Sequence, residues 1–187
     1  MTPDSLPFTA DAEANRLLAA NPTALLIGML LDQQFPMERA FLAPHLLRQR
    51  LGGRLDAATV AGLDDTTLDS VFAGPPALHR FPGSMGRRCR DLCAHLVGEY
   101  DGDASRLWST SADGADLLRR LVALPGFGTA KARIFVGVVG KRLGAGPPGW
   151  EAAAADWPSI ADVDRFEHVA VLRQQKRAMK AQQKSGG

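Results

Sequence analysis

The segment best suited to chemistry is a short glycine-containing turn between two expected helices. It reads Leu124-Pro-Gly-Phe-Gly-Thr-Ala-Lys-Ala-Arg133, with Gly126 and Gly128 at the second and fourth positions of the turn. Glycine allows a positive φ and leaves the backbone uncovered. The amides of Gly126, Gly128 and Thr129 should then lie at the start of the second helix, where free N–H groups and the helix dipole attract an anion.

A nucleic-acid phosphate suits this turn better than a nucleotide cofactor does. No strand signal precedes the glycines, as a nucleotide-binding loop would require. Lys131 and Arg133 follow one turn into the helix and add positive charge. A plain corner between two helices, with glycines used for packing, is the alternative interpretation.

Helical periodicity recurs along the chain, and sustained apolar–polar alternation is missing, so an all-α fold is predicted. Asn21 and Pro22 are typical of an N-cap and a first helical residue. The helix that follows, over 23–34, is apolar almost all round until Asp32 and is predicted to be buried at the centre. Asp164 with Glu167 predicts a capping box at the start of the last helix. Further helices are predicted over 11–20, 36–51, 57–61, 65–72, 83–100, 105–109, 113–124 and 128–143.

Several segments occur in the order found in a known family. The apolar run from Leu26 ends in Gln33-Gln34, a helix over 85–96 carries Arg87 and Arg88, and Trp157-Pro-Ser-Ile-Ala-Asp-Val-Asp164 follows the Leu-Pro-Gly-x-Gly turn. Together they resemble the helix–hairpin–helix, Gly/Pro…Asp superfamily of base-excision DNA glycosylases, of the endonuclease III type, over residues 22–168.

The resemblance implies a two-lobed all-α fold with a DNA-binding cleft between the lobes. A six-helix barrel lobe would span 22–142 and contain the helix–hairpin–helix. The second lobe would combine 1–21 with 143–172 and carry the Asp segment. Residues 173–187 would form a basic, flexible tail.

The family's essential Asp lies at a helix start facing the cleft. Counting from Trp157 places it on Val163, so either neighbour, Asp162 or Asp164, requires a shift of one residue. Asp164 is favoured because it is the predicted capping residue. A carboxylate there would stabilise positive charge on the sugar as the N-glycosidic bond breaks, and would activate water.

Bifunctional members of the family carry a Lys two residues after the second hairpin glycine, where this chain has Ala130. Lys131 is one residue later, a helical rotation of about 100°. We therefore expect Lys131 to contact phosphate, with a Schiff-base role as the alternative. The resemblance also implies that Gln33 or Gln34 fills the gap left by a flipped base. The predicted DNA contacts are Gln33, Gln34, Gly126, Phe127, Gly128, Thr129, Lys131 and Arg133.

Composition limits the choice of cofactors and location. Cys89 and Cys93 are the two cysteines of 187 residues, too few for a four-thiolate iron–sulfur cluster, and their spacing favours buried core thiols. No cofactor is expected apart from a monovalent cation considered at the hairpin. With no signal peptide or membrane-spanning run in the sequence, we expect a cytoplasmic, nucleoid-associated monomer. Trp150 and Trp157 are expected to pack, with stacking on an extruded base as the alternative.

Charge is distributed unevenly. The chain carries a net charge of +2, but from Val169 onward it has five basic residues and no acidic one, so residues 1–168 carry a net −3. A basic end of this kind attracts polyanions.

The resemblance implies a monofunctional DNA glycosylase that acts on duplex DNA with a damaged or mismatched base, and the basic end is consistent with a nucleic-acid partner. The alternative is a non-catalytic helix–hairpin–helix DNA-binding protein.

Overall fold

The computed structural model describes residues 2–187, and every regular element in that range is helical. The predicted all-α class is confirmed. The elements are α1 (Ala12–Ala20), α2 (Pro22–Leu31), α3 (Met37–Arg50), α4 (Ala57–Ala61), α5 (Asp65–Ala73), α6 (Pro82–Tyr100), α7 (Arg106–Ser109), α8 (Gly114–Val122), α9 (Thr129–Gly137), the π-helical turn η1 (Val138–Arg142), α10 (Trp150–Ala153), the 3₁₀ turn η2 (Ile160–Asp162) and α11 (Glu167–Ser185).

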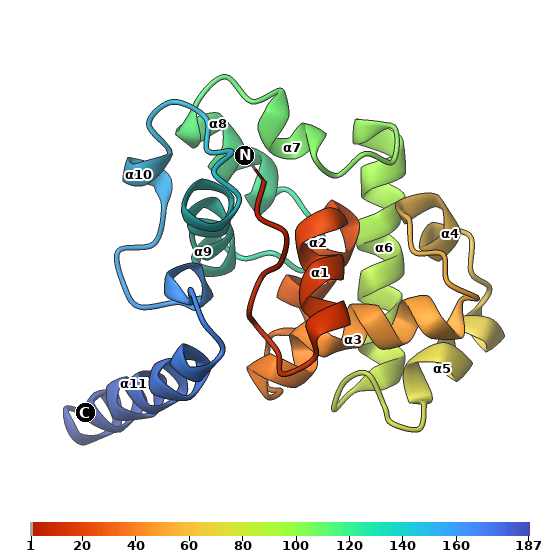
Figure 1. Cartoon of the computed structure of the whole chain (residues 1–187), viewed down its shortest axis with the longest axis horizontal. Coiled ribbons are helices and arrows are strands. Elements are labelled where there is room, and N and C mark those ends of the chain that lie inside the picture. Colours follow the sequence, from red (N-terminus) through yellow and green to blue (C-terminus); the bar gives the residue numbers. More distant parts are fainter. Residues whose placement is uncertain (1) are drawn as a thin grey trace.

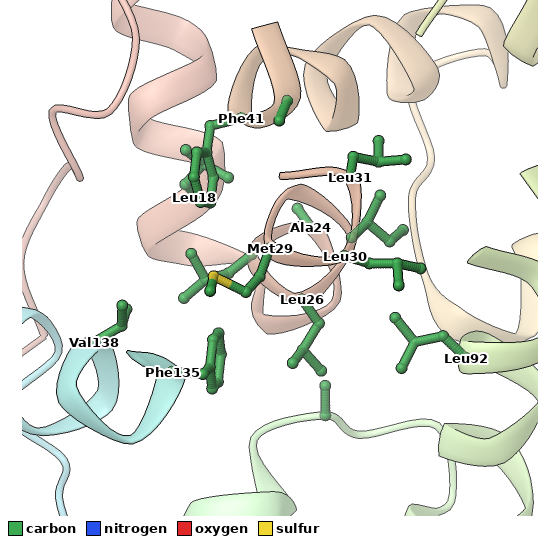
Figure 2. Packing of buried hydrophobic residues seen from close by; sticks show 14 of the residues in the cluster. Leu18, Ala24, Leu26, Met29, Leu30, Leu31, Phe41, Leu92, Phe135 and Val138 are labelled. Atoms are coloured by element: carbon green, nitrogen blue, oxygen red, sulfur yellow. The ribbon is translucent and has the colours of Figure 1, made fainter. Parts of the chain in front are cut away.

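Helix α2 is the centre of the molecule, as its apolar sequence predicts. Asn21 caps it by accepting from the Ala24 amide, and every residue after Pro22 is buried. Side chains from α1, α3, α6 and α9 surround it, and Leu26, Met29 and Leu30 point into different parts of this shell (Figure 2). Because a helix that is apolar on all sides needs neighbours on all sides, α2 fixes where the other helices pack.

On one side of α2, the long helix α6 carries α4 and α5 on its outer face (Figure 1). Cys89 and Cys93 lie on its inner face with no exposed surface, which confirms the predicted core thiols. Burial raises the pKa of both thiols, that of Cys93 to about 12. Neither is therefore a reactive thiolate.

On the other side, α8 and α9 pack against each other, and α10 packs on both (Figure 1). The continuous helix predicted over 128–143 is interrupted, because α9 ends at Gly137 and a π-helical turn follows. Trp150 packs against Gly140 and Gly146, where an added Cβ would lie 2.3 Å from its indole ring. Its predicted packing role is confirmed.

The C-terminal residues differ from the prediction in two ways. No capping box forms at Asp164, because α11 begins at Glu167 with Phe166 as its N-cap and no side-chain cap. The capping box belongs to Ser159 and Asp162 at η2 instead. Where a flexible tail was predicted over 173–187, the chain continues α11 to Ser185, projecting from the body (Figure 1).

The apolar core is one continuous cluster that includes residues from Leu6 to Leu172. Helix α1 packs on α2 and α3. The division into a lobe over 22–142 and a second lobe over 1–21 and 143–172 stays a prediction, and its first residue lies outside the described range. Within residues 2–187, a helix of membrane-spanning length and apolarity arises only if α1 and α2 are counted together across their 114° bend.

Candidate nucleic-acid interface

The hairpin between α8 and α9 is held against the end of α2. Gly126 has φ +82°, and an added Cβ would lie 2.3 Å from Cδ1 of Leu30. Both the backbone conformation and the close approach therefore require glycine. The Leu30 side chain fills the space that the missing Cβ leaves.

Gly128 differs from Gly126, because nothing in the folded chain requires a glycine there. It is the N-cap of α9, with φ −82° and ψ 172°, which any residue adopts, and no atom lies within 4 Å of an added Cβ. No side chain caps α9. Gly126, Gly128, Thr129 and Ala130 are exposed, so the start of the helix faces solvent as predicted.

Phe127 takes a different position from the one predicted. Its ring is 5% exposed and meets Phe135 edge-on at 6.2 Å between centroids, and its amide donates to the carbonyl of Leu124 at 3.1 Å. Phe127 therefore anchors the hairpin to the core. The backbone of Gly128 and Thr129 is the part left open to a ligand.

Lys131 points inward toward α2. Its Nζ donates to the carbonyl of Leu30 at 3.0 Å. That carbonyl lies in the last turn of α2, where the helix dipole favours a cation. Burial lowers the pKa of Lys131 to about 8, and Asp32 partly opposes this shift. The predicted phosphate contact is therefore not available to Lys131 in this arrangement.

Arg133 also points away from the hairpin. Its guanidinium lies 5.0 Å from the ring centroid of Trp157 and donates to the carbonyl of Ala154 at 2.9 Å. Asp156 lies 3.8 Å away. Arg133 thus binds the α10–η2 connection to α9.

Gln33 and Gln34 differ in how far hydrogen bonds and burial restrict them. The side chain of Gln33 is held, since its Nε2 donates to the Leu30 carbonyl at 2.8 Å. The backbone of Gln33 is held as well, because its carbonyl oxygen lies 2.9 Å from Nε2 of the buried His79. Gln34 is exposed and has φ +51°, an uncommon conformation for a residue other than glycine. Strained backbone of this kind is concentrated at functional sites. Gln34 is therefore the more available of the two.

Both glutamines line a cavity of about 640 Å³ between the α2–α3 connection and α11, which we call the α11 cavity. Asp32 lines it beside them, and Trp157 and Pro158 close one end. Four basic residues of α11 line the opposite side: Arg173, Lys176, Arg177 and Lys180.

The two predicted carboxylates lie outside the α11 cavity. Asp162 accepts from Nζ of Lys141 at 2.6 Å and from the amide of Ser159 at 2.9 Å, in a neighbouring cavity of about 550 Å³. Burial acts to raise the pKa of Asp162, but these hydrogen bonds outweigh it and lower the pKa. Asp164 is half exposed and lies 2.8 Å from Nδ1 of His168. The structure thus does not bring either carboxylate together with Gln33 and Gln34.

Sequence reasoning missed Asp32 and the basic residues of α11 as members of one site. Asp32 was noted only as part of the polar end of α2, and the residues of α11 from 173 onward were expected to form a flexible tail. An acid directly before the glutamine pair was the available signal. The position of α11 beside the α2–α3 connection depends on tertiary packing, and no local sequence pattern indicates it. Within residues 2–187, no group of three or more His, Cys, Asp or Glu is placed to hold a metal ion. The cation considered at the hairpin stays a prediction.

Comparison with known proteins adds little to this geometry. No family model matches the chain. A tRNA dimethylallyltransferase of Geobacter metallireducens is 30% identical over 97 residues, which are 52% of this chain and 27% of that protein. The chain thus spans about a quarter of the relative's length, and the match does not establish a family.

The buried position of Lys131 predicts a pH-dependent stability. Its pKa is about 8 in the folded chain against an ordinary value of 10.5, so between these values the unfolded chain binds more protons at this group, and the contribution of Lys131 to stability rises with pH. The raised pKa values of Cys89 and Cys93 act in the opposite direction, equally in wild type and variant. Lys131→Met should remove the contribution of Lys131. The measurement is urea unfolding at about pH 7.5 and about pH 10, comparing the change in unfolding free energy between wild type and variant.

Lys184→Met, at the exposed end of α11, is the matched control and should keep the wild-type change with pH. Equal changes with pH in wild type and Lys131→Met would show that Lys131 is not held in the environment described.

Proposed function

We propose that the chain binds duplex DNA through the hairpin between α8 and α9, with a phosphate against the amides of Gly128 and Thr129. The observation that carries this proposal is Gly128, which neither backbone conformation nor packing explains. A glycine at an exposed, uncapped helix start permits the close approach of an anion.

We further propose that the protein is a base-excision DNA glycosylase, and a monofunctional one. A base must leave the stack before its glycosidic bond can be cleaved. The α11 cavity lies within the range of about 300–1,000 Å³ typical of small-molecule sites, and its basic wall suits the flanking phosphates. In this proposal Gln34, which is exposed and lines the cavity, fills the gap in the duplex. The hydrogen bond that Nζ of Lys131 donates to the carbonyl of Leu30 favours hydrolysis over a Schiff base.

The resemblance suggests Asp162 or Asp164 as the carboxylate that assists cleavage of the glycosidic bond, and both stay proposals for that role. Each can be replaced by Asn, which preserves the size of the side chain and keeps an oxygen that accepts hydrogen bonds. A large loss of excision with unchanged DNA affinity would assign the role to that residue.

A non-catalytic DNA-binding protein is the second candidate, favoured by the ion pairs that hold Asp162 and Asp164. The partial relative, a tRNA dimethylallyltransferase, is named for another nucleic acid. A match over 27% of that protein does not carry its reaction to this chain.

Gly128→Asp should separate DNA binding from folding. Asp is a better N-cap than Gly by a few tenths of a kcal/mol, so stability should hold or rise slightly. The new carboxylate would repel phosphate and cover the amides, and losing one charge-assisted hydrogen bond costs about 1.5–3 kcal/mol. We expect DNA affinity to fall about ten- to a hundredfold, measured by fluorescence anisotropy at fixed salt.

Gly98→Asp is the matched control, because it adds the same charge at an exposed α6 position with no atom within 4 Å. It should leave affinity close to that of wild type. Gly126→Ala should instead destabilise the fold, through its positive φ and its contact with Leu30. Unchanged affinity in Gly128→Asp would remove the hairpin from the DNA interface.

The glycosylase proposal predicts release of a free base from at least one duplex in a panel of damaged and mismatched oligonucleotides. The abasic product should be cleaved by alkali, and borohydride should trap no covalent complex. Salt-sensitive binding with no base released from any duplex would support the second candidate instead. A trapped complex lost in Lys131→Met would show that Lys131 acts as a nucleophile.

A further inference from the structure

Asp32 is the one acidic residue that lines the α11 cavity, within the range the structure describes. It lies directly before Gln33 and Gln34 and across the cavity from the basic residues of α11. A carboxyl group at this point adjoins the space that we propose receives the flipped nucleotide.

The carboxylate of Asp32 is free to act on a ligand. None of the hydrogen bonds or ion pairs among the described residues uses it, whereas Asp162 is held by Lys141, and Asp164 by His168. Asp32 is partly buried, and its carboxylate oxygens are not among the buried polar atoms that lack a partner, so solvent reaches them from the cavity. A carboxylate that lines a cavity and has no partner in the protein is open to a ligand there.

The position of Asp32 is also unfavourable for folding. It is the C-cap residue of α2, where the negative end of the helix dipole repels an anion. Residues that oppose local stability are expected mainly at functional sites. Lys176 of α11 and Lys131 of α9 are the cations that act on Asp32, and both favour its ionised form.

We propose that Asp32 is the carboxylate of the α11 cavity that stabilises the positive charge developing on the deoxyribose and accepts a proton from the attacking water. The inference rests on the proposed glycosylase function. It assigns the carboxylate to the end of α2, in preference to Asp162 and Asp164.

The reaction balances without any further cofactor. The bond from C1′ to the base nitrogen breaks, and its electron pair leaves with the base, which takes a proton from solvent. The oxygen of water forms the new bond to C1′, and Asp32 accepts the proton that this water loses. Burial raises the pKa of Asp32, which makes it a stronger proton acceptor than an ordinary carboxylate, while Lys176 and Lys131 oppose the shift.

A binding experiment tests this role without knowledge of the lesion. Two duplexes are compared, one with a cationic pyrrolidine in place of a deoxyribose and the other with the neutral tetrahydrofuran analogue. A carboxylate in the cavity should make wild type bind the cationic duplex about tenfold more tightly or better, given the coupling energies of close charge pairs. Asp32→Asn, which preserves size, should abolish this preference and keep the affinity for the neutral duplex.

Asp91→Asn, at an exposed position of α6, is the matched control and should keep the preference. Asp162→Asn and Asp164→Asn test the competing assignments, and a preference lost in either of them overturns the inference. Asp32→Glu retains the charge and should restore part of it, and circular dichroism melting establishes that each variant is folded. Binding of both duplexes without a preference, or a preference that survives in Asp32→Asn, overturns the inference alone. Absence of binding to any duplex overturns the proposed function and the inference with it.

Discussion

The carbonyl of Leu30, in the last turn of α2, is the point on which the candidate site depends. It accepts from Nζ of Lys131 and from Nε2 of Gln33, so one oxygen joins the hairpin helix to the glutamine pair. The Leu30 side chain meanwhile occupies the space that Gly126 leaves open. Because α2 is buried on all sides, this joint has a fixed position, and the uncapped start of α9 is held at a defined place on the surface.

The charged residues near these contacts have two different roles. Lys131 and Arg133 follow the hairpin in sequence, yet both point inward and stabilise packing, which leaves backbone amides as the exposed positive feature of the turn. The charged side chains that a polyanion would meet belong to α11 instead, across the cavity from Asp32. Backbone dipoles hold their position without side-chain entropy cost, so a phosphate site of this kind is preorganised.

Local sequence signals predicted much of this arrangement. The Asn21-Pro22 start of α2, its burial, the core thiols and the glycine turn each follow from chemistry within a few residues. The direction of the Lys131 side chain does not follow from local chemistry, because a rotation of one residue along the helix decides whether it points to solvent or to the end of α2. The spacing of Asp164 and Glu167 predicted a capping box there, but Ser159 and Asp162 form the box in the structure, where Asp162 also accepts from Nζ of Lys141. The course of α11 depends on contacts such as the ion pair of Arg173 with Glu38.

The central claim is that backbone amides at the start of α9 bind a DNA phosphate. Amide-resolved NMR during titration with a short duplex tests it most directly, at low salt and again at high salt. The account predicts that the largest shifts fall on the amides of Gly128 and Thr129, and that they diminish as salt rises. Shifts confined to other surfaces, with these two amides unchanged at saturation, would contradict it.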